Sequence, residues 1–164
     1  MVSLANPRRG TVLKQIYTDS ILMIERLHRR FLDVIKTELD RLKIDDINNV
    51  QTLILYNISA EQLTIGELTN RGYYLGSNVS YNVKKLVEND YLVQERAPHD
   101  KRSTRIKLSD KGLGLCKKID ELYQRNVEAL SGEMNVAALT EMNNILSQLE
   151  RFWTDYINNI HKVK

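Results

Sequence analysis

Residues 96–112 read RAPHDKRSTRIKLSDKG, and this stretch decides the predicted fold. Within it, residues 104–108 alternate polar or basic with apolar side chains, the two-residue period of a strand with one buried face. Residues 91–96 (YLVQER) precede it as a second strand candidate. Between the two, residues 97–103 are mostly polar and basic, too polar to be buried. We therefore expect a two-stranded hairpin with a long basic tip, which is a wing.

Two short helices joined by a tight turn are expected before this hairpin. Residues 64–67 (TIGE) fit a capping box, in which a threonine and a glutamate three residues apart satisfy each other's backbone amides. They predict a helix over about 65–71. A turn bounded by glycines, residues 72–76, leads to Ser77, a good N-cap for a helix that runs to about residue 89. This pair has the pattern of a helix-turn-helix.

The second helix of the pair has an apolar and a polar face. Val79, Val83, Leu86 and Val87 recur at helical spacing, so they predict its buried stripe. The side chains that project elsewhere are uncharged-polar or basic: Asn78, Tyr81, Asn82, Lys84 and Lys85. Such a face suits the hydrogen-bonding edges and phosphates of a nucleic acid.

The net charge of +3 conceals an uneven distribution along the chain. Residues 71–118 hold eleven basic and five acidic side chains, or +6, whereas the remainder holds thirteen basic and sixteen acidic, or −3. A localised basic surface attracts phosphates. The alternative is a solvated surface whose charges have no binding role.

Three longer segments have the apolar period of amphipathic helices, at about 11–42, 109–130 and 136–160. A shorter helix begins near residue 50 and ends near 57–60. Together these features predict a mainly α fold of six helices with a small β wing, a winged helix-turn-helix.

One small winged module cannot cover three such helices. We therefore expect residues 11–44 and 109–162 to be dimerisation helices that pack on a second subunit, and residues 45–108 to be the DNA-binding domain. Residues 1–10 would be an N-terminal arm. An intramolecular helix bundle is the alternative, because a bundle covers apolar stripes equally well.

Composition excludes several classes of function. With 164 residues, 42% of them hydrophobic, and without an apolar run long enough to span a bilayer or a signal-peptide pattern, we expect a cytoplasmic protein with no membrane partner. The lone Cys116 and the scattered His28, His99 and His161 predict neither a disulfide nor a metal site. The chain has no phosphate-cradling glycine loop, HExxH or GxSxG, so we expect neither an enzyme nor a bound cofactor.

Residues 96–112 resemble the wing signature of MarR-type transcriptional regulators, with its Asp-x-Arg tip, a following hydrophobic-x-Leu-Ser/Thr and a terminal glycine. The order of elements extends the resemblance over nearly the whole chain. It implies a homodimer that binds a pseudopalindromic double-stranded DNA operator. Residues 73–76 and 78–85 most resemble an alphaproteobacterial branch that includes a regulator of L,D-transpeptidase, which implies control of cell-wall or stress genes. Tyr73 and Tyr74 depart from the smaller residues common in the family.

The resemblance also implies which residues contact DNA. Arg102 matches the wing arginine that enters the minor groove, and Asp100 would orient it, although an aspartate alone could be a surface turn residue. The expected DNA-binding residues are Ser77, Asn78, Ser80, Tyr81, Asn82, Lys84, Lys85, Asp100, Lys101, Arg102 and Arg105.

Control by a small-molecule effector, commonly an aromatic acid or phenol, is a further implication of the resemblance. The candidate lining residues are Leu27, Phe31, Leu53 and Tyr56, for which ordinary core packing is the alternative. For Cys116, which lies on an apolar stripe, an inert buried thiol is favoured over a redox sensor. A different class of function stays open: a winged-helix module that binds protein or RNA without specific recognition of DNA.

Overall fold

The structure, a computed structural model, describes residues 7–58, 62–70, 76–97 and 100–162. The expected turn at 72–75, with Tyr73 and Tyr74, lies outside the described residues, as do Pro98 and His99. The elements in chain order are α1 (Pro7–Leu42), α2 (Asn49–Ile58), β1 (Leu63–Thr64), α3 (Ile65–Asn70), α4 (Gly76–Glu88), β2 (Leu92–Ala97), β3 (Asp100–Leu108), α5 (Asp110–Leu130) and α6 (Val136–Lys162).

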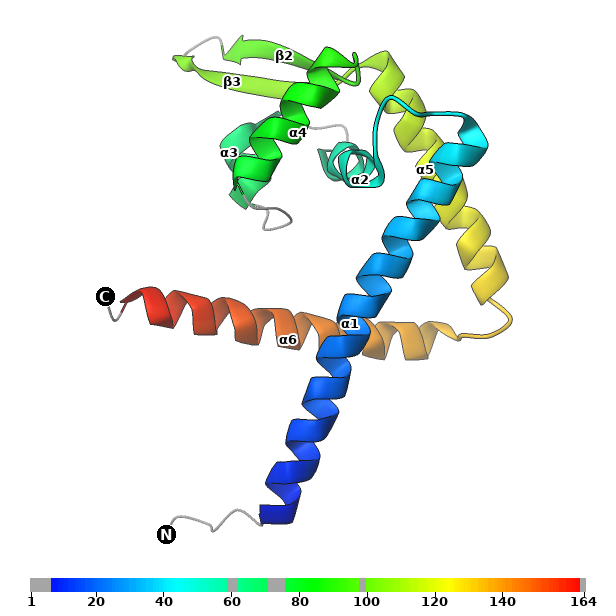
Figure 1. Ribbon diagram of the computed structural model, residues 1–164, viewed down its shortest axis with the longest axis vertical. Coiled ribbons are helices and arrows are strands. Elements are labelled where there is room, and N and C mark those ends of the chain that lie inside the picture. Colours follow the sequence, from blue (N-terminus) through cyan, green and yellow to red (C-terminus); the bar gives the residue numbers. More distant parts are fainter. Residues whose placement is uncertain (1–6, 59–61, 71–75, 98–99, 163–164) are drawn as a thin grey trace. The chain divides into compact units, whose positions relative to one another are not determined.

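The predicted fold class is confirmed: the described residues form six helices and one small sheet, with the winged helix-turn-helix built from α2 to β3 (Figure 1). The chain forms two compact units, Met1–Ile119 and Asp120–Lys164. In the first unit, α3 packs against α4 and α2 packs on α1, α4 and β3. Its innermost side chains are wholly buried and come from five of these elements: Ile35, Ile54, Leu55, Ile58, Leu68, Val79, Val83, Leu86 and Ile106.

The wing belongs to a three-stranded antiparallel sheet with strand order β1-β3-β2, not to a two-stranded hairpin. The additional strand is β1, which pairs with β3. Its Leu63 lies opposite Ile106, and both side chains are buried. The sequence prediction missed β1 because its two residues are too few to display a strand period.

The predicted long loop at the wing tip is wrong. Strand β3 already begins at Asp100, which lies opposite Ala97, whereas Thr104 lies opposite Arg96, so residues 101–103 belong to the strand but have no residue opposite them. The register shifts between Arg96 and Ala97. A bulge of this kind adds residues to one strand and interrupts the alternation on which the sequence prediction depended.

One predicted helix start is confirmed, and two differ from the prediction by a few residues or fewer. The capping box is present: the Glu67 amide donates to Thr64 Oγ1 at 3.1 Å, and the Thr64 amide donates to Glu67 Oε2 at 2.6 Å. Helix α1 begins earlier than expected, at Pro7, a residue favoured in the first helical turn. Helix α4 begins at Gly76, so Ser77 lies inside its first turn and the predicted N-cap is wrong by position.

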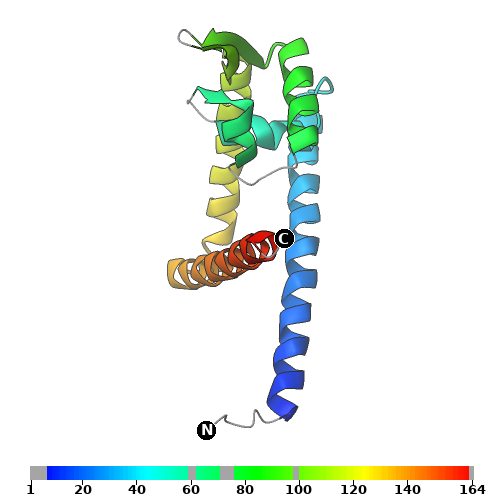
Figure 2. The ribbon, with the colours of Figure 1, turned by 90° about the vertical axis from the view of Figure 1, so that its left-hand side faces the viewer.

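Long apolar faces remain exposed on the two longest helices. Helix α1 continues past the winged module (Figure 2), and its Val12, Leu13 and Ile16 are 57, 67 and 58% exposed. On α6, Phe152 and Tyr156 are 58 and 61% exposed, with their rings stacked at 6.5 Å between centroids. Among the described residues, no helix is long and apolar enough to cross a membrane.

Candidate nucleic-acid interface

Helix α4 presents a polar face above a fully buried stripe. Val79, Val83 and Leu86 have no exposed surface, as predicted, whereas Val87 is only partly buried. On the opposite face Asn78, Ser80 and Tyr81 are exposed, and the Tyr81 side chain is 62% accessible. The apolar stripe therefore fixes the rotation of α4, and that rotation turns these polar side chains outward.

Asn82 is part of this face but is held close to the helix. Its side chain is half-buried, and Nδ2 donates to the backbone carbonyl of Asn78 at 2.8 Å. An asparagine recognises adenine through its paired amide donor and acceptor. The local bond uses one of the two Nδ2 hydrogens, so a contact of Asn82 with a base would use the other hydrogen and Oδ1.

The two lysines of α4 share one acid that the sequence prediction did not include. Lys85 Nζ lies 2.7 Å from a Glu88 carboxylate oxygen, and Lys84 Nζ lies 3.8 Å from the other. The hydrogen bond to Glu88 raises the pKa of Lys85, and the same bond lowers the pKa of Glu88. Because acids three and four residues after a lysine face it on a helix, the spacing alone could have indicated Glu88.

The wing contributes a second basic surface. Arg105 is exposed on β3 opposite Glu95, and Lys107, two residues further on, forms an ion pair with Glu95. Glu95 therefore offsets part of the positive charge that the sequence assigns to this strand.

Four predicted residues have a described backbone but no described side chain. Ser77 lies in the first turn of α4, and Asp100, Lys101 and Arg102 lie at the start of β3. The DNA-binding roles of the whole predicted set stay predictions.

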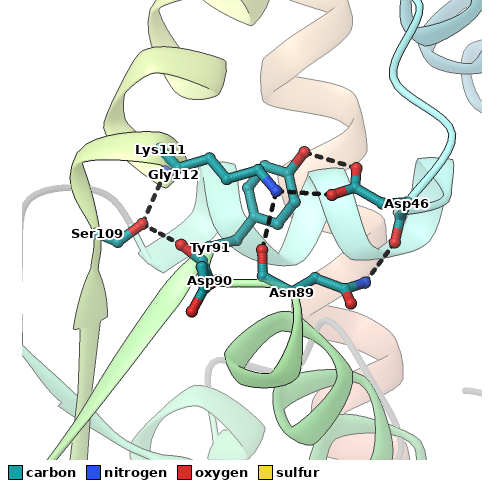
Figure 3. Close-up of polar contacts among 7 residues, drawn as sticks. All are labelled: Asp46, Asn89, Asp90, Tyr91, Ser109, Lys111 and Gly112. Atoms are coloured by element: carbon teal, nitrogen blue, oxygen red, sulfur yellow. Dashed lines mark hydrogen bonds and ion pairs between the residues drawn. The ribbon is translucent and has the colours of Figure 1, made fainter.

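A cluster of polar side chains ties the base of the wing together (Figure 3). The Tyr91 hydroxyl donates to Asp46 Oδ1 at 2.8 Å, and Lys111 Nζ lies 2.7 Å from Asp46 Oδ2. Lys111 Nζ also donates to the Asn89 carbonyl at 3.0 Å and lies 4.1 Å from the centre of the Tyr91 ring. The Asn89 amide group donates to the Asp46 carbonyl. We call Asp46, Asn89, Tyr91 and Lys111 the wing-base cluster.

The wing-base cluster stabilises a charged carboxylate. Partial burial acts to raise the pKa of Asp46, but the hydrogen bonds from Lys111 and Tyr91 outweigh it and lower that pKa below its ordinary value. Burial first, and then the hydrogen bond to Asp46, raise the pKa of the Tyr91 hydroxyl, so that Tyr91 remains a donor. Sequence patterns could not reveal this cluster, because Asp46 and Lys111 are 65 residues apart.

Ser109 and Gly112 close the hairpin beside the cluster. The Gly112 amide donates to Ser109 Oγ at 3.0 Å, which confirms Ser109 as the N-cap of α5. The Ser109 amide donates to the Tyr91 carbonyl at 3.1 Å, and its hydroxyl donates to the carbonyl of Asp90. A Cβ atom at Gly112 would lie 2.3 Å from the Tyr91 carbonyl oxygen. The terminal glycine of the wing signature therefore has a steric cause.

The candidate effector residues are not fully buried within one chain. Leu27 and Phe31 on α1 are 56 and 36% exposed, and Leu53 and Tyr56 on α2 are partly exposed. The alternative of ordinary core packing is therefore wrong for Leu27 and Phe31 within one chain. Cys116 is also partly exposed, so the expectation of a buried thiol is wrong.

Comparisons with known proteins agree with this geometry. The family described as "Winged helix DNA-binding domain" matches residues 47–112. The exopolysaccharide II synthesis transcriptional activator ExpG of Rhizobium meliloti is 37% identical over 138 residues, which cover 84% of this chain and 71% of that protein.

Two solved structures have a similar fold. FabT of Streptococcus pneumoniae, in complex with DNA, superposes with a TM-score of 0.71 at 18% identity and covers 85% of this chain and 98% of its own. MarR of Staphylococcus aureus, in complex with salicylate and kanamycin, superposes with a TM-score of 0.70 at 23% identity. The match covers 90% of this chain and 96% of that one. From the relative and the matched domain together, the chain belongs to the family of winged-helix, DNA-binding transcriptional regulators that includes ExpG, and its fold is that of MarR.

Proposed function

We propose that this regulator acts as a homodimer, that it binds a pseudopalindromic operator in double-stranded DNA, and that a small ligand changes its affinity. The observation that carries the proposal is the arrangement of α4, whose fully buried valines and leucine turn Asn78, Ser80 and Tyr81 toward solvent. Two such helices related by a twofold axis would enter successive major grooves about 10 bp apart.

Exposed apolar surface supports the dimer. Among the described residues, α1 exposes Val12, Leu13 and Ile16, and α6 exposes Phe152 and Tyr156, each by more than half of its surface. Contiguous apolar surface of this kind on a soluble chain marks an interaction site. A second copy of the chain offers the same stripes and forms a closed twofold assembly.

The effector part of the proposal rests on α1 and α2. Leu27, Phe31, Leu53 and Tyr56 are apolar side chains that keep some solvent access, which a ligand site requires. Salicylate is present in the Staphylococcus aureus MarR structure, so an aromatic acid is the first compound to test. A ligand changes DNA affinity only by the difference in its own affinity for the two states of the protein.

For the target genes we propose cell-envelope or stress functions. The relative ExpG is named for activation of exopolysaccharide II synthesis, which concerns the cell surface. The narrower likeness to a regulator of L,D-transpeptidase concerns the cell wall and stays a prediction.

The decisive experiment is selection of bound duplexes from a random-sequence library by the purified full chain. The proposal expects enrichment of an inverted repeat, and a mass of two chains by sedimentation equilibrium. Phe152→Glu should shift that mass toward one chain, whereas Glu150→Gln, also on α6, should leave it unchanged. Binding of all duplexes alike, or preference for RNA or a protein, would instead favour a winged-helix module without specific recognition of DNA.

A further inference from the structure

The wing-base cluster connects three parts of the fold that must be mutually oriented for DNA binding. Asp46 lies in the loop between α1 and α2, Asn89 and Tyr91 lie in the turn between α4 and β2, and Lys111 lies in the first turn of α5 (Figure 3). The C-terminus of α4, the start of β2 and the end of β3 therefore all lie within a few residues of the cluster along the chain.

Tyr91 is the residue at which these connections meet. Its amide donates to the Leu86 carbonyl at 2.8 Å, while the Asp90 amide donates to the Val87 carbonyl at 3.1 Å, so the end of α4 is closed by a Schellman-type pair of bonds. Its carbonyl accepts from Ser109, its hydroxyl donates to Asp46, and its side chain is only 2% exposed. The C-terminus of α4 and both ends of the hairpin are thus fixed to the backbone of one buried residue, whose side chain in turn bonds to Asp46.

Asp46 is itself held in place by the end of α1. Lys43 has φ of 58°, a left-handed conformation, and the Ile44 amide donates to the Leu39 carbonyl at 3.0 Å, which closes α1. Three residues after Lys43, the Asp46 carboxylate accepts from Tyr91 and Lys111. The orientation of the wing relative to α1 is therefore set through Asp46.

We propose that the wing-base cluster positions the wing against α4 for DNA binding, with Asp46 and Lys111 as positioning residues. The inference rests on the proposed function. Strand β2 has six residues, so its far end at Ala97 lies about 20 Å from the cluster at about 3.3 Å per residue. A rotation of roughly 5° at the base then moves that end by about 1.7 Å, enough to break a hydrogen bond to DNA.

The competing explanation for Lys111 is direct contact with a phosphate. Its side chain is 46% exposed and carries a positive charge. If such a contact were its only role, Lys111→Met would weaken binding, Tyr91→Phe would have no effect, and Asp46→Asn would tighten binding because it removes a negative charge.

If the cluster positions the wing, the three substitutions should change DNA affinity in a different way. Lys111→Met, Tyr91→Phe and Asp46→Asn should each lower affinity by about five- to tenfold, the loss expected for one charge-assisted hydrogen bond. The charge-raising Asp46→Asn is the most informative of the three. Asp45→Asn is its matched control, because it changes the same charge on the adjacent exposed residue, and it should keep or slightly raise affinity.

The test measures the dissociation constants of the folded variants for the duplex that the wild-type chain selects from a random library, and for an unselected duplex of equal length. Circular dichroism at the assay temperature establishes that each variant is folded. Weaker binding by Asp46→Asn and Tyr91→Phe supports positioning, whereas tighter binding by Asp46→Asn with unchanged Tyr91→Phe overturns it. If the wild type selects no duplex, the proposed operator binding is wrong. The affinities of Asp46→Asn and Tyr91→Phe for the unselected duplex, weaker or not weaker than that of the wild type, then decide whether the cluster positions the wing.

Discussion

A Cβ atom placed on Gly112 would lie 2.3 Å from the carbonyl oxygen of Tyr91, whereas one placed on Gly114, in the same helix, would have nothing within 4 Å. The same oxygen accepts the Ser109 amide, so it cannot move away without loss of the bond that closes the wing. The glycine at the end of the wing signature is thereby explained by the packing of α5 against the start of β2.

We expect Gly112→Ala to destabilise the protein by about 2–3 kcal/mol, because a backbone oxygen cannot give way as a flexible side chain does. Gly114→Ala is the matched control. It lies in the same helix with nothing within 4 Å of its added Cβ, so it should stabilise by about 0.5–1 kcal/mol. Urea unfolding of both variants measures the difference, and equal effects of the two substitutions would contradict the steric account.

The wing-base cluster should make stability depend on pH in acid. The pKa of Asp46 is lowered on folding from its ordinary 3.8, so its ion pair stabilises the folded state above that pH and is lost as the pH falls through the lower, folded-state pKa. The difference in unfolding free energy between wild type and Asp46→Asn should be constant above about pH 5 and shrink below about pH 4. A difference that stays the same down to pH 3 would exclude this role for Asp46.

Arg102 should make one electrostatic contact with DNA from the wing. Arg102→Ala is expected to weaken DNA binding and to reduce the slope of log affinity against log salt by about one counterion. Arg151→Ala, an exposed arginine on α6, is the control and should leave the slope unchanged. An unaltered slope for Arg102→Ala would remove the wing arginine from the interface.

Glu88 should restrain non-specific binding, because it pairs with both Lys84 and Lys85. Glu88→Gln should raise affinity for a random duplex by about two- to fivefold at low salt and steepen the salt dependence. Glu150→Gln makes the same change of charge on α6 and should have a smaller effect. Equal gains for the two variants would mean that only net charge matters.

The helical part of the site could be predicted from the sequence because its signals are local. The period of Val79, Val83 and Leu86 fixes the exposed face of α4, and the spacing of Thr64 and Glu67 fixes the start of α3. Glu88 was missed although its spacing to the lysines is equally local.

The remaining features depend on contacts between distant residues. Strand β1 has two residues and exists only because Leu63 and Thr64 pair with β3. The register shift after Arg96 lengthened β3 beyond its alternating part. The wing-base cluster joins Asp46 to Lys111 by side-chain bonds, which leave no periodic pattern in the sequence.

Footprinting of the full chain on its selected duplex tests the central claim most directly. A homodimer with two α4 helices predicts two protected patches related by a twofold axis, with centres about 10 bp apart in successive major grooves. The patches should coincide with the two halves of an inverted repeat. A single patch without twofold symmetry, or protection that does not depend on sequence, would contradict the account.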